Sequence, residues 1–330
     1  MESDLSLIRI PISTYRLHFN RQFTFSDATR IVSYLDELGI SDIYASPCLA
    51  ARKGTALGYD VVDPTRLNPE IGTLGSFRKL TRELRKARMG LILDIVPNHM
   101  YVESAENEWW QDVLENGPSS PYSAFFDIDW RPVEIKLENK VLIPILGAQY
   151  GTVLERQDLK VAFGKGAFFL RYFHHKLPIL PETYPDILRL RIDSLEGSLP
   201  SGDLPHLTEL QSIITGLDRL PSYTESDLTR LGERSREKEI IKKRLSDLCR
   251  ESSGIRAFIN GNIAILNGAA DDPHSFDRLD DLLNKQAWRL SYWRVATEEI
   301  NYRRFFDING LAAIRVENPV VFEKTHRFVL

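Results

Sequence analysis

Residues 90–100 read GLILDIVPNHM, and the fold predicted for the chain is built around them. Leu91–Val96 is an almost continuous apolar run, which is typical of a strand buried on both faces. Asp94 alone interrupts it. An unpaired carboxylate in such a strand is costly, so a cation, a set of donors or a polar cavity must meet it. Because the polar pair Asn98 and His99 follows at once, the stretch predicts the mouth of a barrel.

The composition is that of an ordinary globular chain. Its 330 residues allow one large domain or two smaller ones. With 43% hydrophobic and 27% charged residues and a net charge of -4, it offers no electrostatic case for nucleic acid or an anionic membrane as partner. The first ten residues, MESDLSLIRI, lack the basic start of a secretory signal, and no apolar run is long enough to cross a bilayer. We expect a cytoplasmic location, and sugars and other neutral ligands remain open as partners.

The sequence gives no support for a metal or cofactor. Cys48 and Cys249 are the only two cysteines and lie far apart, as reduced structural thiols do. The chain contains no CxxC, HExxH or glycine-rich phosphate loop. We therefore expect no metal, nucleotide or flavin chemistry.

Strands and helices alternate over residues 1–100. The patterns predict strands at 8–19, 40–45 and 91–96 and helices at 25–38 and 77–87, with a long loop at 46–75. This is a βαβαβ order with short connections, the beginning of a parallel α/β fold.

The alternation ceases after residue 100. We interpret residues 101–274 as an inserted subdomain. Its first part, to about residue 205, is rich in aromatic residues and proline, with short β-like runs at 141–146 and 168–173, and a helical stripe follows at 227–250. Trp109 and Trp110 fit its core better than a sugar platform, and the basic run at 238–244 fits a solvated helix face. Residues 275–330 are predicted to return to the barrel through a helix at 275–304 and an apolar run at 311–316.

Two motifs carry a family resemblance. Residues 94–99, DIVPNH, resemble the first signature region of the α-amylase superfamily of glycoside hydrolases, at the end of barrel strand three. Residues 58–60, GYD, resemble the motif after barrel strand two. Longer stretches are similar to one branch, the maltooligosyltrehalose synthases: PISTYRL at 11–17, YASP at 44–47, ENGPSS at 115–120, FDIDW at 126–130, IPILG at 143–147 and NYRRFFDI at 301–308.

The resemblance implies a fold and a reaction. The fold is the N-terminal part of a (β/α)8 TIM barrel, comprising strands one to three and the approach to strand four, with a large insertion after strand three. The reaction is an intramolecular transglycosylation that converts the reducing-end α-1,4 linkage of a maltooligosaccharide into the α,α-1,1 linkage of trehalose. Because no match to the motifs of the nucleophile, the acid/base or the third carboxylate occurs before residue 330, we expect a piece of a longer enzyme. It would be inactive alone, with open strand edges.

The same resemblance assigns supporting and substrate-binding roles but no catalytic residue. Asp94 would orient an arginine near the nucleophile and support the sugar at subsite -1, where His99 would donate to a hydroxyl. Tyr59 would stack on a pyranose, and Asp60 would accept from hydroxyls or pair with an arginine outside this chain. Asn98 is the remaining substrate-binding candidate. Without the motifs, these residues would be a paired core carboxylate, a surface tyrosine and ordinary turn residues.

Two further positions bear on this assignment. Leu57 stands where the family usually has histidine before the GYD motif, so the outer contacts of that loop differ. Arg315 and Glu317 imitate the arginine-x-aspartate of the nucleophile strand, but the following residues resemble a family segment upstream of that strand. A carboxylate at the start of a helix explains Glu317 better.

Two other functions are compatible with the sequence. An amylase-like hydrolase or 4-α-glucanotransferase would share the same barrel motifs and would release glucose or shorter maltodextrins. A non-catalytic glucan-binding fragment would bind maltooligosaccharides without any turnover.

Overall fold

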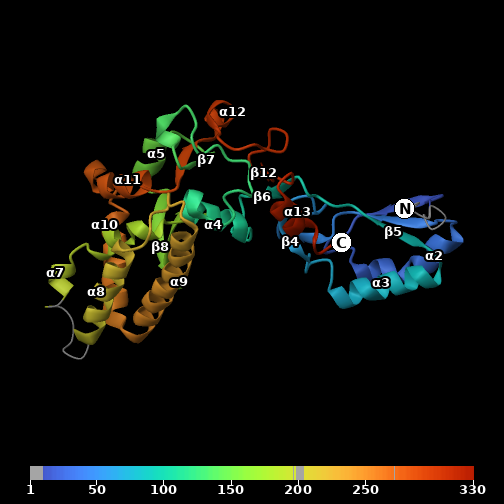
Figure 1. Ribbon diagram of the computed structural model, residues 1–330, viewed down its shortest axis with the longest axis horizontal. Coiled ribbons are helices and arrows are strands. Elements are labelled where there is room, and N and C mark those ends of the chain that lie inside the picture. The colour runs from blue at the N-terminus through green and yellow to red at the C-terminus, as the bar shows by residue number, and fades with distance from the viewer. Residues whose placement is uncertain (1–9, 196, 198–203, 271) are drawn as a thin grey trace. The chain divides into compact units, whose positions relative to one another are not determined.

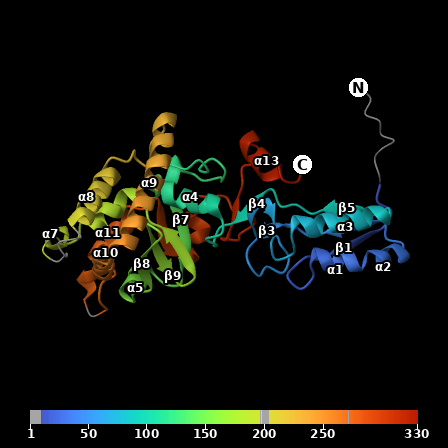
Figure 2. The same ribbon diagram turned by 90° about the horizontal axis from the view of Figure 1, so that it is seen from below.

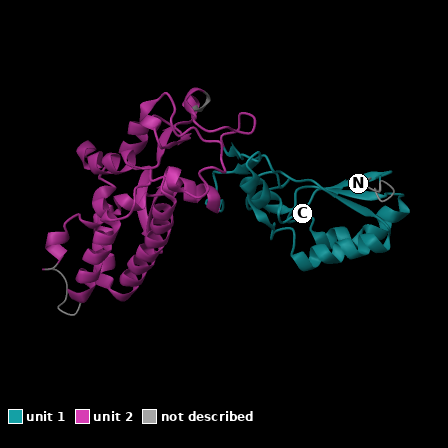
Figure 3. Cartoon of the chain, in the orientation of Figure 1, with its two compact units in different colours: residues 1–107, 310–330 teal, residues 108–309 magenta. Residues whose placement is uncertain are grey.

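A computed structural model describes residues 10–195, 197, 204–270 and 272–330 (Figure 1). The chain forms two compact units, which Figure 3 distinguishes by colour. Unit 1 comprises residues 1–107 and 310–330, and unit 2 comprises residues 108–309. The predicted start of the first strand, residues 8 and 9, lies outside the described residues. Residues 275–309 belong to unit 2, so the predicted return at residue 275 occurs only at residue 310.

Unit 1 is built on a parallel sheet in the order β1-β2-β5, formed by β1 (Thr14–Leu17), β2 (Asp42–Ala45) and β5 (Gly90–Leu93). The helices α1 (Phe25–Arg30) and α2 (Val32–Glu37) connect the first two strands, and α3 (Leu74–Lys86) precedes the third. A single helix was predicted over 25–38, but Ile31 leaves the helical conformation and separates two short helices.

Helices cover one face of this sheet, as the views of α2 and α3 in Figures 1 and 2 show. Alternate side chains of β1 and β2, Leu17, Ile43 and Ala45, are buried in that layer with residues of α1–α3. The prediction of a third strand buried on both faces is wrong. Ile92 and Ile95 are 36% and 37% exposed, because β5 is an edge strand and ends at Leu93.

The predicted long loop contains a hairpin. Its strands β3 (Leu49–Ala51) and β4 (Val61–Leu67) pair antiparallel with two register irregularities. Such bulges break the period-two alternation by which strands are recognised in a sequence, and Pro64 within β4 masks the pattern further.

The apolar run at 311–316 does not extend the parallel sheet. It gives β12 (Leu311–Ala313), which pairs antiparallel with β6 (His99–Tyr101). The expected approach to a fourth barrel strand stays a prediction. After it, α13 (Pro319–His326) begins at the N-cap Asn318, whose side chain accepts from Val320 N.

Unit 2 combines two small sheets with a helical layer. A parallel pair consists of β7 (Val141–Leu146) and β11 (Trp288–Tyr292), and an antiparallel sheet consists of β8 (Leu159–Gly164), β9 (Ala167–Tyr172) and β10 (His175–Pro178). The predicted β-like runs at 141–146 and 168–173 are confirmed. The helices are α4 (Glu108–Asn116), α5 (Tyr150–Glu155), α6 (Tyr184–Leu188), α7 (Ile192–Leu195), α8 (Leu204–Asp218), α9 (Leu228–Glu251), α10 (Ser253–Leu266), α11 (Asp277–Asn284) and α12 (Ala296–Glu299), with 3-10 turns at 117–119, 135–137, 181–183, 273–276 and 293–295.

Two predictions for unit 2 are wrong. The helix at 275–304 ends after α11, because Trp288 is buried, donates to Pro178 O at 2.8 Å and begins β11. The basic run at 238–244 is not a solvated face throughout. Lys238 is only 4% exposed, and its Nζ lies 2.9 Å from the Glu115 carboxylate. Trp110 is buried against Phe126, as expected of a core residue.

No helix in the described part of the chain has both the length and the apolar character needed to cross a bilayer.

Candidate active site

The candidate site lies on the face of the unit 1 sheet that the helices leave open. Arg16 of β1, Tyr44 of β2 and Ile92 of β5 are aligned in register. Side chains alternate between faces, so these three share one face and Asp94, two residues after Ile92, belongs to it. Asp94 directly follows β5 and stays in line because its N–H donates to Ala45 O at 3.0 Å. A half-exposed polar face thus opposes the apolar core.

Three donors meet the Asp94 carboxylate, whose side chain is 17% exposed. The Tyr59 hydroxyl donates to Oδ2 at 2.6 Å, Arg16 Nη2 at 3.2 Å and the Tyr44 hydroxyl at 3.3 Å. Arg16 also donates to the Tyr59 hydroxyl and lies over the Tyr44 ring, 4.3 Å from its centroid. Of the expected alternatives, a cation, a set of donors or a polar cavity, the first two meet this carboxylate. One anion is thereby held in fixed geometry by a cation and two phenols.

A tight turn presents Tyr59 to this cluster. Gly58 has φ +80°, and a Cβ there would lie 2.7 Å from Pro47 O, so the position requires glycine. Tyr59 is 36% exposed, which leaves part of its ring open to a ligand. Its hydrogen bond to the Asp94 carboxylate raises the pKa of the Tyr59 hydroxyl. The phenol therefore stays protonated and donates at neutral pH.

His99 contacts the Tyr59 turn, and Asn98 contacts His99. His99 is 2% exposed, its Nε2 lies 3.1 Å from Tyr59 O, and its Nδ1 lies 2.9 Å from the Asn98 side chain. Burial lowers the pKa of His99, so the ring is neutral at pH 7. The Asn98 backbone O accepts from Ile314 N at 3.0 Å. In this arrangement the imidazole supports the turn that carries Tyr59.

Asp60 pairs with an arginine of this chain. Arg52 Nε donates to Asp60 Oδ2 at 2.7 Å, and the same guanidinium lies over the Tyr101 ring at 5.1 Å. The other oxygen, Oδ1, is buried, and no donor among the described residues reaches it. One acceptor of Asp60 is therefore left for a further donor.

Sequence reasoning missed Arg16, Tyr44 and Arg52 as members of the site. Arg16 and Tyr44 lie in stretches that were noted for their resemblance, PISTYRL and YASP. The available signal was that each is a charged or phenolic residue within an alternating strand pattern. Only the register shows that both face Asp94.

Leu57 and Glu317, the two further positions noted in the sequence, lie outside the Asp94 cluster. Leu57, where the family usually has histidine, is 49% exposed. Arg315 Nε lies 3.2 Å from Glu317 Oε1, and Glu317 immediately precedes the N-cap of α13. This supports the assignment of Glu317 to a helix start.

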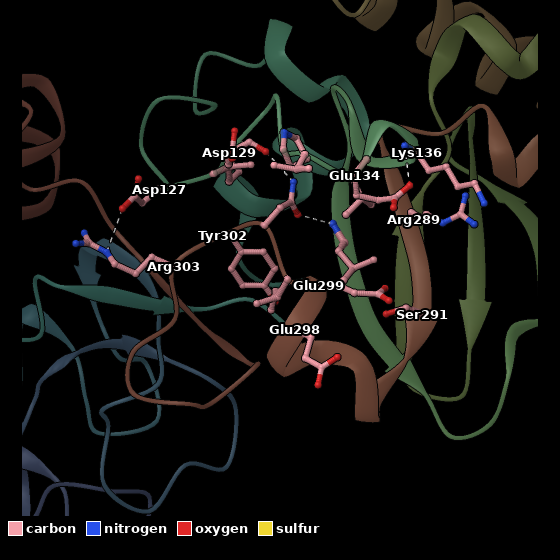
Figure 4. Close-up of a pocket in the computed structure, with 17 residues that line it drawn as sticks. Asp127, Asp129, Glu134, Lys136, Arg289, Ser291, Glu298, Glu299, Tyr302 and Arg303 are labelled. Carbon is pink, nitrogen blue, oxygen red and sulfur yellow. Dashed lines mark hydrogen bonds and ion pairs between the residues drawn. The ribbon is translucent and has the colours of Figure 1, made fainter.

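Unit 2 holds a separate polar pocket of about 800 Å³ (Figure 4). Two stretches noted for their resemblance, 126–130 and 301–308, meet in its wall. Asp129 N donates to Asn301 O at 2.7 Å, and Arg303 N donates to Asp127 O at 2.9 Å. Figure 4 also shows the ion pair of Arg303 with Asp127, 3.1 Å long.

The parallel strands, the helix layer and the carboxylate after the third strand define an α/β catalytic domain of the amylase type. A family model described as alpha amylase, catalytic domain, matches residues 28–195, and the chain belongs to this family.

Particular members of the family are similar to it. A protein of Mycobacterium tuberculosis, provisionally named a maltooligosyl trehalose synthase, is 45% identical over 153 residues, which cover 44% of this chain and 20% of that protein. The intracellular maltogenic amylase of Bacillus subtilis is 35% identical over 102 residues, 31% of this chain and 16% of that one. The matched part is thus a fifth or less of each of these two relatives.

Solved structures extend the similarity to nearly the whole chain. The maltooligosyltrehalose synthase of Arthrobacter ramosus superposes with a TM-score of 0.61 at 28% identity, covering 97% of this chain and 29% of that structure. A second maltooligosyl trehalose synthase structure gives a TM-score of 0.63 at 27% identity, with 97% and 30% coverage. The chain therefore spans under a third of the length of these enzymes.

Proposed function

We propose that this chain forms the N-terminal part of an enzyme that rearranges the reducing-end α-1,4 linkage of a maltooligosaccharide into the α,α-1,1 linkage of trehalose. The observation that carries the proposal is the Asp94 cluster at the carboxyl end of β5, in a chain that superposes over 97% of its length on a maltooligosyltrehalose synthase. The substrate is an α-1,4-glucan, and the product keeps the chain length.

In this proposal unit 1 supplies barrel strands one to three and unit 2 is the insertion after strand three. The order β1-β2-β5, the helices on one face and the polar residues on the other support it. In a TIM barrel the helices form the outer ring and catalytic groups lie at the carboxyl ends of the strands. Asp94 occupies such an end.

The proposed roles follow from the contacts. Asp94, fixed by Arg16 and Tyr59, supports the glucose unit at subsite -1 and is not the nucleophile. The open part of the Tyr59 ring stacks on that pyranose. Asp60 offers its unpaired oxygen to a donor.

His99 and Asn98 complete the proposed substrate site. His99 contacts the Tyr59 carbonyl, and the Asn98 side chain contacts the other ring nitrogen of His99. For His99 to donate to a sugar hydroxyl directly, its Nε2 must exchange the Tyr59 carbonyl for the ligand.

A retaining reaction also needs a nucleophile and an acid/base whose carboxyls lie roughly 5 Å apart. We propose that both follow residue 330, so the chain by itself should bind glucan without turnover.

The test is a chimera in which this chain replaces the corresponding part of the Arthrobacter ramosus enzyme. Asp94→Asn should abolish the conversion of maltopentaose into a non-reducing product while the circular dichroism stays unchanged. Asp36→Asn, an exposed carboxylate of α2, is the matched control and should retain activity. Near-normal activity of Asp94→Asn would refute the assigned role.

A further inference from the structure

The pocket of unit 2 has a rigid frame. Asn301 is 7% exposed, and its side chain makes three hydrogen bonds: Nδ2 donates to Asp129 O and Lys140 O at 2.9 and 2.8 Å, and Oδ1 accepts from Leu142 N at 2.9 Å. These bonds join segments about 160 residues apart in sequence. A pocket held in this way exists before a ligand arrives, which lowers the entropic cost of binding.

Polar groups in its wall lack partners. Ser291 Oγ is buried and makes no hydrogen bond to any described residue. A buried hydroxyl without a partner is costly, and native proteins satisfy such groups with water or a ligand. Arg289, half-buried in the same wall, has no carboxylate within ion-pair distance among the described residues. The wall therefore offers unused donors, and Glu298 and Glu299 add acceptors from α12.

The charges and shape select a neutral, hydroxylated ligand. Five carboxylates face three cations in the lining, which disfavours phosphates and other anions. A polyol can use carboxylates as acceptors and Arg289 and Ser291 as donors at once. At the rim, Val133 is fully exposed beside Pro132, so an apolar surface adjoins the polar wall. A pyranose has the same two kinds of surface, and the volume suits a ligand of a few rings.

We propose that this pocket is a second carbohydrate site, which binds a short segment of α-1,4-glucan independently of the Asp94 cluster. Only the choice of glucan among polyols rests on the proposed function. The site would hold the substrate chain on unit 2.

The test is calorimetric titration of maltotriose into the 330-residue chain. Ser291→Ala and Glu299→Gln should each weaken binding to the pocket at least tenfold. The matched control Glu251→Gln, at the exposed end of α9, should stay within twofold. Asp94→Asn should leave the pocket's binding intact, so the two sites are told apart by which variants affect them.

Three results would overturn the proposal. The first is the absence of any heat attributable to unit 2, with all binding lost in Asp94→Asn. The second is unchanged affinity in both pocket variants with unchanged circular dichroism. The third is competition by inorganic phosphate or glucose 6-phosphate, which would show an anion site. The first result would leave the proposed function in place. Conversely, pocket binding together with hydrolytic products from the chimera would refute the proposed function and leave the pocket proposal in place.

Discussion

Replacing Glu115 by a neutral residue should lower the free energy of unfolding of unit 2 strongly. Glu115, in α4, has a side chain 10% exposed and accepts from Lys238 at 2.9 Å and from Lys242, both in α9. Glu115→Gln leaves Lys238, 5% exposed, with only Asp112 at 3.5 Å and Glu239 at 3.3 Å. Breaking a buried ion pair from one side costs about 3–5 kcal/mol. We expect a loss in that range for unit 2.

Tryptophan fluorescence during urea unfolding measures this loss. All five tryptophans lie between residues 109 and 293, so the signal reports unit 2 alone. With a slope of about 2 kcal/mol per molar urea, the midpoint should fall by about 1.5–2.5 M. Lys86→Met, which breaks the exposed Lys86–Glu83 pair in unit 1, should leave the tryptophan midpoint unchanged. A loss below about 1 kcal/mol for Glu115→Gln would refute the reasoning, since it would mean that water screens the pair.

Three further predictions concern single groups. Burial acts to raise the pKa of Glu115, but Lys242 and Lys238 outweigh it and hold that pKa below 4.5. The urea midpoint of unit 2, followed by tryptophan fluorescence, should therefore fall as the pH drops below about 4.5. Glu115→Gln should flatten this pH dependence, and an unchanged slope in that variant would contradict the prediction. Gly58→Ala should destabilise unit 1 by about 1–2 kcal/mol and weaken glucan binding at the Tyr59 turn, because Gly58 has φ +80° and a Cβ there would lie 2.7 Å from Pro47 O. Circular dichroism and calorimetry measure the two effects. Wild-type behaviour of the variant would show that the turn relaxes. Asp94→Asn should lower the raised pKa of the Tyr59 hydroxyl, measured by ultraviolet titration with Tyr59→Phe as the reference, and no shift would mean that the two side chains are apart in solution.

Local patterns predicted much of unit 1. The apolar run at 91–96 with its single carboxylate located Asp94 and required partners for it. The partners themselves, Arg16 and Tyr44, depend on the register of β1 and β2, and a one-residue shift would turn both away. The hairpin at 49–67 was missed because its bulges and Pro64 remove the alternating pattern.

The errors in unit 2 have a different cause. Lys238 lies in the same stripe of α9 as Ile241 and Leu245, so its spacing indicates a buried position, while its charge suggests an exposed one. The group that makes burial possible is Glu115, more than 120 residues away. Likewise, the helical pattern after residue 285 gives way to β11 because β7 offers a pairing edge. Long-range partners decide such segments, and a sequence pattern does not contain them.

The product balance of the chimera with maltopentaose is the sharpest test of the proposed trehalose-forming reaction. We expect reducing ends to disappear while the number of glucose units per molecule stays at five, as mass spectrometry and a reducing-sugar assay together would show. Release of glucose or shorter maltodextrins as the main products would contradict it and indicate a hydrolase or a glucanotransferase.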